Sequence, residues 1–360
     1  MNRNPYSKLN GKSREQVAKT KIGIAMSGGV DSTACALLLQ KNHDVHAFFM
    51  QLAQPDLEQQ IKRVQEITTR CSIPLQIIDL SADFEKTVLH YFATSYKKGR
   101  TPNPCIICNR EIKFGLFMDS ILERGMDRVA TGHYAKTTND AGCLLLQQGT
   151  DETKDQSYFL ARLTQQQLAR VEFPLGEMTK DDVYNFVEKH GFTDFRGQES
   201  QDVCFLGTDS IGRFLETREF DLATRGDIVR TDGQVLGSHN GIYNYTIGQR
   251  RGLGIAAATP LYVIRIDAEN NRIIVGENHE LFQETIEIEN VLWNCDRHPE
   301  PGHIYRVRIR YGHQGQEAGI EQISTKRFRI TFTVKQRAVT PGQFAVIYDQ
   351  DLVLGSGEIQ

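Results

Sequence analysis

Apolar positions in the first half of the chain alternate between two patterns. Short apolar runs cover 22–26, 45–52, 75–80 and 127–131. Between these runs, apolar residues recur at helical spacing, over 56–70, 84–96 and 111–124. Strands separated by helices of this length are usually parallel, with helices on both faces of the sheet. We therefore predict an α/β domain with a doubly wound parallel sheet, in which ligands bind beyond the carboxyl ends of the strands.

The pattern changes after about residue 205, where glycine-rich turns and short β-branched runs replace the helices. The run over 226–230 is followed by a run over 232–237 that begins with an Asp-Gly pair, which is typical of a hairpin. Further strand-like runs cover 307–311, 328–334 and 344–348. We predict a small β-rich domain and a C-terminal β-barrel, with a sandwich as the alternative to the barrel. The predicted divisions are a loose lead-in over 1–20, a catalytic domain over 21–207, a central domain over 208–278 and the barrel over 279–360.

Composition limits the classes of protein to consider. A chain of 360 residues with 39% hydrophobic content is expected to form two or three globular domains. No uninterrupted apolar run reaches membrane-spanning length and none resembles a secretion signal, so we expect a cytoplasmic protein without a membrane partner. The net charge of −3 argues against a uniformly basic nucleic-acid binder, but it does not exclude a local basic face.

The segment with the clearest chemistry is Ser27-Gly28-Gly29-Val30-Asp31-Ser32, between the apolar run 22–26 and a helix-like stretch over 33–40. In a strand-to-helix turn, glycines let backbone N–H groups approach a phosphate, and the helix directs its positive end toward it. The segment matches neither the Walker A pattern nor the dinucleotide-binding pattern. It resembles the SGGxDS loop of ATP pyrophosphatases, which cut ATP between the α- and β-phosphates. The alternative is an ordinary glycine turn.

Seven cysteines are present. Their odd number and irregular spacing disfavour a disulfide framework. Cys35, Cys71 and Cys143 lie in apolar patterns and are predicted to be core residues, whereas the position of Cys295 gives no signal.

Cys105 and Cys108 lie on either side of a predicted helix start, where the thiolate form is favoured. A single Cys-x-x-Cys is weak evidence, since it is compatible with redox chemistry, half a metal site or coincidence. Cys204, considered by its spacing alone, is predicted to be a core residue.

Six segments, taken together, resemble the bacterial tRNA-specific 2-thiouridylase family and follow its order. They cover 25–32, 101–114, 130–134, 154–159, 200–207 and 245–253. Such enzymes replace the 2-oxygen of the wobble uridine in certain tRNAs with sulfur. Two other functions share the phosphate loop: an amidotransferase-like or lysidine-type ATP pyrophosphatase, and an ATP-binding module without turnover. The first of these has no use for Cys108 and Cys204.

The resemblance implies a role for each matching residue. Cys108 would be the nucleophile, Cys204 would carry a persulfide, and the two would form a transient disulfide. ATP, with Mg²⁺, would be held by Ala25, Met26, Ser27, Gly28, Gly29, Val30, Asp31, Ser32, Met50 and Gly132. The target base would face Asn103, Pro104 and Cys105. Other tRNA contacts would come from His133, Lys154, Asp155, Gln156, Arg310, Tyr311 and Gln343. The sulfur would come from a persulfide donor protein, either a sulfur relay protein or a cysteine desulfurase.

Cys105 departs from the family pattern, because many members have an aspartate there that is a candidate general acid/base. A thiol is a weaker acid than a carboxyl group, so Cys105 suits the proton-transfer role less well than an aspartate does. One interpretation makes Cys105 a passive replacement near the base. The other makes it the third ligand, with Cys108 and Cys204, of an iron–sulfur cluster.

Overall fold

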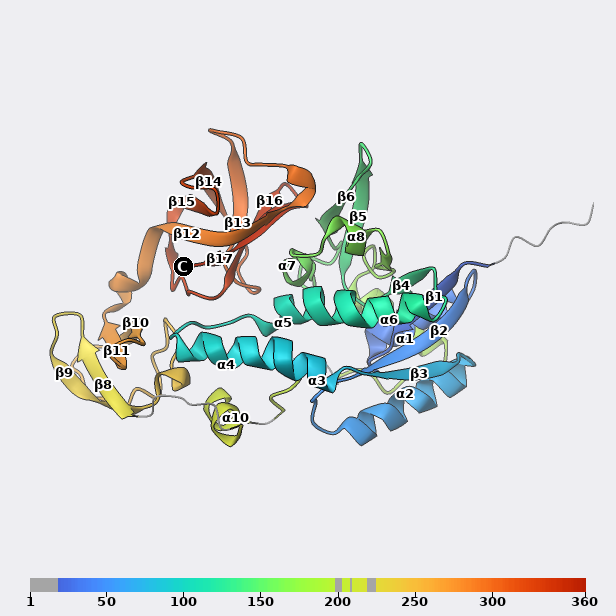
Figure 1. The fold of residues 1–360 in the computed structure, drawn as a ribbon, viewed down its shortest axis with the longest axis horizontal. Helices are drawn as coiled ribbons and strands as arrows, with labels where there is room; N and C mark the ends of the chain where they lie inside the picture. Colours follow the sequence, from blue (N-terminus) through green and yellow to red (C-terminus); the bar gives the residue numbers. More distant parts are fainter. Residues whose placement is uncertain (1–18, 198–202, 208, 219–224) are drawn as a thin grey trace, which may run out of the picture.

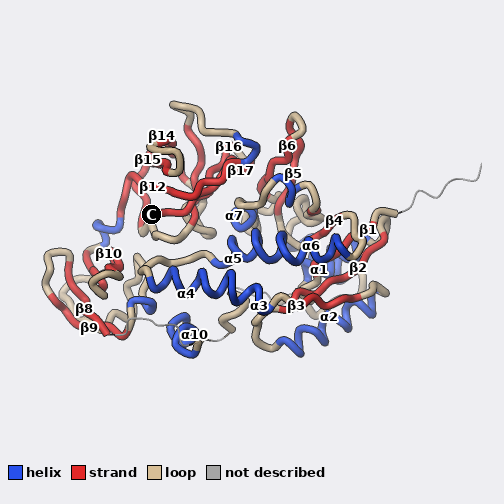
Figure 2. Tube along the Cα trace, in the orientation of Figure 1, coloured by secondary structure: helices blue, strands red, loops and turns tan. Residues whose placement is uncertain are grey.

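The computed structural model describes residues 19–197, 203–207, 209–218 and 225–360. Its strands form three sheets of five, four and eight strands (Figure 1). Helices are concentrated in the first half of the chain and strands in the second half (Figure 2). No helix in the described ranges is long and apolar enough to cross a membrane.

The first sheet is parallel throughout and has the order β3-β2-β1-β4-β7. Its strands are β1 (Lys21–Ala25), β2 (Asp44–Gln51), β3 (Leu75–Asp79), β4 (Arg128–Ala130) and β7 (Val171–Glu172). The strand order reverses between β1 and β4, and in such sheets this point is where ligands bind. The predicted doubly wound sheet is therefore confirmed.

Two hydrophobic cores cover the two faces of this sheet. Phe48 and Phe49 are neighbours on β2, so their side chains point to opposite faces and join different cores. One core includes α1 (Val30–Leu39), α2 (Leu57–Cys71) and α9 (Lys180–Lys189). The other includes α3 (Ser81–Phe84), η1 (Glu85–Leu89), α4 (His90–Lys97) and the helix described next.

The helix that carries two of the candidate thiols begins earlier than the sequence pattern predicted. It runs through α5 (Pro104–Ile107), the π-helix η2 (Cys108–Phe117) and α6 (Met118–Glu123). Asn103 caps it by accepting a hydrogen bond from the N–H of Ile106, and Pro104 occupies the first turn, which tolerates proline. Cys105 and Cys108 therefore both lie inside the helix.

The predicted hairpin around Asp232-Gly233 is confirmed, because it joins β8 (Arg225–Arg230) to β9 (Val235–Asn240). These strands form the four-stranded sheet with β10 (Tyr262–Asp267) and β11 (Arg272–Gly276). The remaining short helices are α7 (Ser157–Leu160), α8 (Gln165–Leu168), α10 (Ile211–Thr217), η3 (Ile242–Asn244), η4 (Asn278–Leu281) and η5 (Asn294–Asp296).

The C-terminal strands close into a barrel. They are β12 (Phe282–Trp293), β13 (Ile304–Arg308), β14 (Gln316–Gln322), β15 (Arg327–Arg337), β16 (Phe344–Asp349) and β17 (Leu352–Ile359). The antiparallel order β12-β15-β14-β13-β16-β17 closes because β12 also pairs with β17. This closure excludes the sandwich. The predicted strand 307–311 is too long, since β13 ends at Arg308 and the chain turns before Tyr311.

A hairpin from the first half of the chain joins this sheet. It consists of β5 (Ala135–Asp140) and β6 (Cys143–Gln148), and it pairs with β17 through Gln147 and Leu352. At its tip Cys143 forms a disulfide with Cys295, whose Cα lies 6.1 Å away. The prediction that Cys143 is a core residue was therefore wrong, and the sequence analysis did not anticipate this single disulfide. The two cysteines are 152 residues apart and meet only through tertiary pairing, which local spacing cannot show.

Candidate active site

The predicted phosphate loop lies between β1 and α1, at the switch point of the parallel sheet. Gly28 has φ of +81°, which favours glycine. Ser32 Oγ donates to the carbonyl of Gly29 over 3.0 Å and accepts from the N–H of Ser27 over 3.3 Å. These bonds fold the loop back over the start of α1, so its N–H groups gather at the positive end of a helix.

The loop after β4 packs directly against the phosphate loop. A Cβ atom on Gly132 would lie 2.7 Å from Cβ of Asp31 and 2.9 Å from its carbonyl carbon, so only glycine fits. Met50, another predicted ATP contact, lies near the carboxyl end of β2 and is half-buried. The structure thus brings these predicted ATP residues to one edge of the sheet.

Asp31 makes polar contacts that the sequence analysis missed. Lys180 Nζ lies 2.8 and 2.9 Å from the two carboxylate oxygens, and the Tyr134 hydroxyl donates to Oδ1 over 2.8 Å. Lys180 is the first residue of α9 and is 149 residues from Asp31 in sequence. A cation is therefore already paired with the carboxylate at the phosphate loop.

The thiols of Cys105, Cys108 and Cys204 lie close enough to influence one another electrostatically. Burial raises the pKa of the Cys108 thiol to about 12 and that of Cys105 to about 11. Cys204 acts electrostatically on both. Cys204 is itself exposed, although surrounding protein atoms still desolvate its thiol and raise its pKa. The prediction that Cys204 is simply a core residue, made from spacing alone, was therefore wrong.

Lys113 is the positive charge shared by these thiols, and it too was missed as an individual residue. It lies one π-helical turn after Cys108 on η2 and lowers the pKa of all three cysteines against the effect of burial. In the part of the chain that the structure describes, no carboxylate forms an ion pair with Lys113. Its ammonium group is therefore available to favour a thiolate.

His133 connects Lys113 to the phosphate loop. Lys113 Nζ lies 3.5 Å from His133 Nε2, and the Thr131 hydroxyl lies 2.8 Å from His133 Nδ1. Burial, followed by the charge of Lys113, holds the pKa of His133 well below its usual value, so the ring is neutral at physiological pH. His133 directly follows Gly132, which packs against Asp31 of the phosphate loop. The thiols and the phosphate loop therefore form one contiguous site.

The same thiols do not match a metal ligand set. Across the described ranges, no three or more side chains of His, Cys, Asp or Glu are placed to hold one ion. A cluster with three cysteine ligands needs its sulfurs arranged around a common centre. The residues therefore do not fit the iron–sulfur interpretation.

The residues predicted to contact tRNA fall into two groups. Arg310 and Tyr311 are exposed on the turn after β13, and Lys154 is half-buried in the facing loop. In contrast, Gln156 exchanges hydrogen bonds with the backbone of Tyr134, and Gln343 donates to the carbonyls of Thr101 and Pro102. The second group therefore supports loops near the site.

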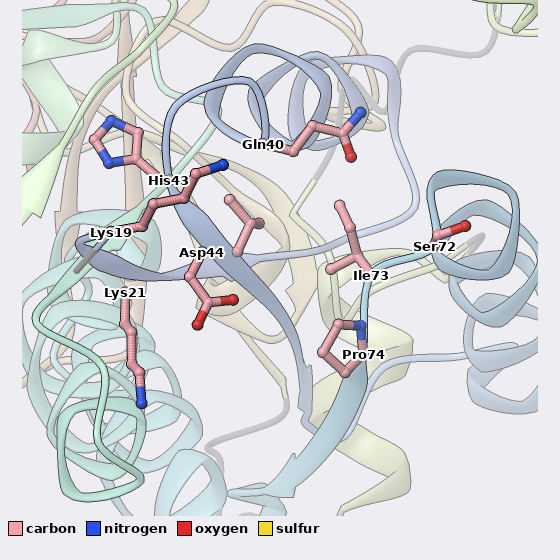
Figure 3. A pocket seen from close by; sticks show the side chains of 9 residues that line it. Lys19, Lys21, Gln40, His43, Asp44, Ser72, Ile73 and Pro74 are labelled. Carbon is pink, nitrogen blue, oxygen red and sulfur yellow. The ribbon is translucent and has the colours of Figure 1, made fainter. Parts of the chain in front are cut away.

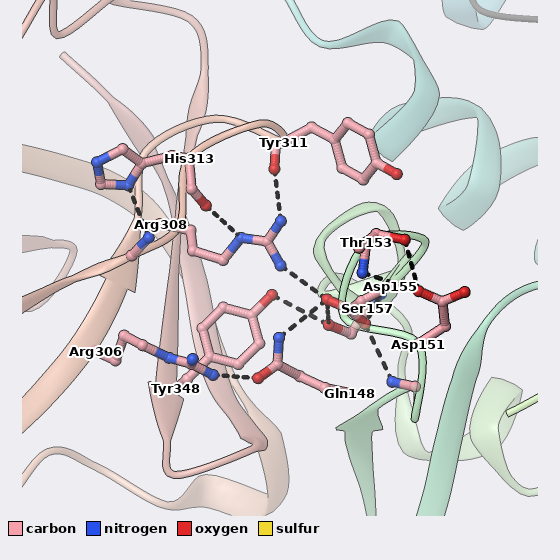
Figure 4. A network of polar contacts seen from close by, with 12 residues as sticks. Gln148, Asp151, Thr153, Asp155, Ser157, Arg306, Arg308, Tyr311, His313 and Tyr348 are labelled. Atoms are coloured by element: carbon pink, nitrogen blue, oxygen red, sulfur yellow. Dashed lines mark hydrogen bonds and ion pairs between the residues drawn. The ribbon is translucent and has the colours of Figure 1, made fainter. Parts of the chain in front are cut away.

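Asp155 and His133 differ most from the predicted role. Asp155 is 2% exposed, and both of its oxygens accept hydrogen bonds from protein groups (Figure 4). His133 is buried between Phe114 and Phe173. In this conformation neither side chain can reach RNA directly, so the predicted direct contacts are corrected to internal ones.

A shallow pocket at the opposite edge of the sheet does not belong to this site. It is lined by residues at the amino ends of β1, β2 and β3, among them Lys19, Lys21, Asp44 and Pro74 (Figure 3). The phosphate loop lies at the carboxyl ends of the same strands, so the sheet separates the two. Ligands of open α/β sheets bind at the carboxyl edge, which favours the phosphate-loop site.

Comparisons with known proteins agree with this geometry. Residues 20–208 match a family profile described as a tRNA methyl transferase HUP domain. Residues 213–277 match the corresponding PRC-barrel domain, and 283–359 match an aminomethyltransferase beta-barrel domain.

Relatives named tRNA-specific 2-thiouridylase MnmA match along almost the whole chain. The protein of Desulfotalea psychrophila is 53% identical over 95% of this chain and 99% of its own. That of Syntrophotalea carbinolica is 41% identical over 94% and 98%, and that of Acetivibrio thermocellus is 38% identical over 96% and 100%. Identity at this level over nearly complete chains places the protein with these relatives: it belongs to the MnmA family of tRNA-specific 2-thiouridylases.

Proposed function

We propose that this protein uses ATP to replace the 2-oxygen of the wobble uridine in tRNA with sulfur. The observation that carries the proposal is the continuity of the site. Cys108 and Cys204 share Lys113, Lys113 contacts His133, and His133 follows the glycine that packs on Asp31. A phosphate loop joined to two interacting thiols suits a reaction that first activates an oxygen and then delivers sulfur.

The first step would be adenylation. The uridine 2-oxygen attacks the α-phosphorus of ATP, which forms an adenylated base and releases pyrophosphate. The N–H groups of the loop and the Ser32 hydroxyl are placed to stabilise charge on the departing pyrophosphate. Asp31 is the residue that would hold a Mg²⁺ ion brought with ATP, and such an ion would supply further positive charge there. AMP is then a good leaving group at C2.

The second step would be sulfur transfer. The outer sulfur of a Cys204 persulfide attacks C2 of the base and AMP leaves, so that the base is joined to Cys204 through a disulfide bond. The Cys108 thiolate then attacks the Cys204 sulfur, which releases the thiolated base and leaves a Cys108–Cys204 disulfide. A thiol reductant restores both cysteines, and a persulfide donor protein reloads Cys204. The surface exposure of Cys204 supports access by such a donor.

The tRNA would present its wobble base out of the anticodon stack, because a stacked base cannot enter a site beside a buried thiol. Arg310 and Tyr311, exposed at the turn after β13, are the candidate contacts with the neighbouring nucleotides. Arginine and aromatic side chains suit unstacked RNA loops, where bases stack on them.

Pyrophosphate release with and without tRNA tests this proposal. The protein should release pyrophosphate from ATP only when a tRNA with an unmodified wobble uridine is present. A matched tRNA with cytidine at the wobble position is the control. Release that is equally fast without tRNA, or with the cytidine tRNA, would reject the proposed substrate and favour another ATP pyrophosphatase.

A further inference from the structure

A buried ion pair connects the barrel to the first half of the chain. Arg308, the last residue of β13, donates from Nη1 to Asp155 Oδ2 over 2.7 Å, across 153 residues of sequence (Figure 4). Arg308 is 8% exposed. Asp155 also accepts from Gly149, from Gln148 Nε2 and from both the N–H and the hydroxyl of Ser157. The carboxylate therefore organises the whole loop that contains it.

The guanidinium of Arg308 organises the facing loop. Nε donates to the carbonyl of His313 over 2.9 Å, and Nη2 donates to the carbonyl of Tyr311 over 2.5 Å (Figure 4). One side chain thus binds two carbonyls of its own turn and a carboxylate of another loop. A planar fork of donors can do this, whereas the single ammonium group of lysine cannot point in all three directions.

The turn held in this way carries an exposed aromatic ring. Tyr311 is 36% exposed, and its ring stacks on Phe159 with centroids 4.3 Å apart and planes 30° apart. The carbonyl of Phe159 accepts a hydrogen bond from Asn109 Nδ2 over 3.1 Å. Asn109 is the neighbour of Cys108 on η2, so the stacked rings lie beside the helix that carries the thiols.

We propose that the Asp155–Arg308 pair is a positioning device, which holds Tyr311 on Phe159 as a stacking platform for an unstacked base of the anticodon loop. This inference rests on the proposed function. An exposed ring already stacked on a second ring loses little freedom when a base stacks on it, so the platform is preorganised. Asp155 and Arg308 act through Tyr311 and do not themselves touch the RNA.

Equilibrium binding of an anticodon stem-loop RNA to the full-length protein tests the device. Tyr311→Ala and Arg308→Met should each weaken binding about tenfold, the loss expected when a base loses an aromatic partner. Arg308→Lys should weaken RNA binding as much as Arg308→Met does, because lysine keeps the positive charge but not the planar fork of donors. In the Tyr311→Ala background, Arg308→Met should cost little more, because it acts through a ring that is already absent. The KM for ATP should stay unchanged.

Arg327→Ala is the matched control, since Arg327 pairs with Glu287 and Glu289 on the same barrel but is exposed. Thermal unfolding of each variant identifies a temperature at which all variants are folded. If Arg308→Met does not fold, Arg308→Lys takes its place in the comparison of single and double variants. Additive losses from Arg308 and Tyr311 variants, or normal RNA binding by Arg308→Lys, would overturn the inference. A wild-type protein that binds the RNA but releases no pyrophosphate would instead reject the proposed function.

Discussion

In the proposed mechanism, Asp31 is the residue on which the ATP chemistry depends most directly. Its carboxylate lies at the phosphate loop and is held by Lys180 and Tyr134. We expect Asp31→Asn to reduce tRNA-dependent pyrophosphate release by about 100-fold or more, because the amide would no longer hold the cation that offsets negative charge on the departing pyrophosphate. Binding of tRNA at equilibrium should not change, because the loop contacts ATP. A variant that releases pyrophosphate at the wild-type rate would show that the loop is only a turn.

Lys113 is the positive charge that opposes the effect of burial on the thiols, and we expect it to influence their reactivity. Burial raises the pKa of Cys108, and Lys113 partly offsets this by favouring the thiolate. Since the thiolate is formed as pH rises, removing the positive charge moves its formation to still higher pH. We therefore expect Lys113→Met to shift the pH profile of Cys108 alkylation toward alkaline pH, measured by mass spectrometry of the labelled peptide. The exposed Lys326→Met is the control, and identical profiles for both variants would contradict this role for Lys113.

The residues of the site differ in how far they could be predicted from the sequence. The phosphate loop was predictable because its backbone shape depends on residues that are adjacent in sequence, including Gly28 in a left-handed conformation. Lys180 and Arg308 were not predictable, because each meets its partner across about 150 residues of chain. No local pattern records such a contact, so neither residue was distinguished from ordinary surface charge.

At the scale of elements, the β5–β6 hairpin has the most consequence, because it extends the barrel sheet and carries the Cys143–Cys295 disulfide. The sequence showed Cys143 in an apolar pattern, but it could not assign that segment to a sheet. The start of the helix over 104–123 was also missed, because it depends on the cap at Asn103 and not on the apolar pattern.

The Cys143–Cys295 disulfide should be detectable in the purified protein and should contribute to its stability. Protein purified under non-reducing conditions should titrate five free thiols among its seven cysteines. We expect Cys143→Ser to lower the free energy of unfolding by about 2–4 kcal/mol under those conditions, because the bond closes a long loop in the unfolded chain. With reductant present, wild type and variant should unfold alike. Seven titratable thiols in the non-reduced protein would contradict the bond.

At the scale of the whole molecule, the chain combines a nucleotide-binding half with a barrel that presents Arg310 and Tyr311 next to it. The fold class of each half was predictable from the sequence, since the periodicity of apolar residues changes near residue 205. It did not show that residues of both halves, such as Asp155 and Arg308, share one buried network.

The electrostatic part of tRNA binding depends on charges distributed over the whole molecule. Although the net charge is −3, affinity for tRNA should fall steeply with salt, because phosphate contacts release counterions. Arg310→Ala should reduce the slope of log affinity against log salt by about one, as expected for one lost phosphate contact. Fluorescence anisotropy over a range of salt concentrations measures both. An affinity that does not depend on salt would argue against RNA as the partner.

The most direct test of the account is a single-turnover reaction of protein loaded with a Cys204 persulfide, followed by mass spectrometry of the tRNA nucleosides. With ATP, the account predicts 2-thiouridine at the wobble position and a Cys108–Cys204 disulfide in the spent protein. Cys108→Ser should leave the RNA linked to Cys204, whereas Cys35→Ser, a change in the buried core, should still yield 2-thiouridine. Thiolated tRNA formed without ATP, or by a Cys204→Ser protein treated in the same way, would contradict the central claim.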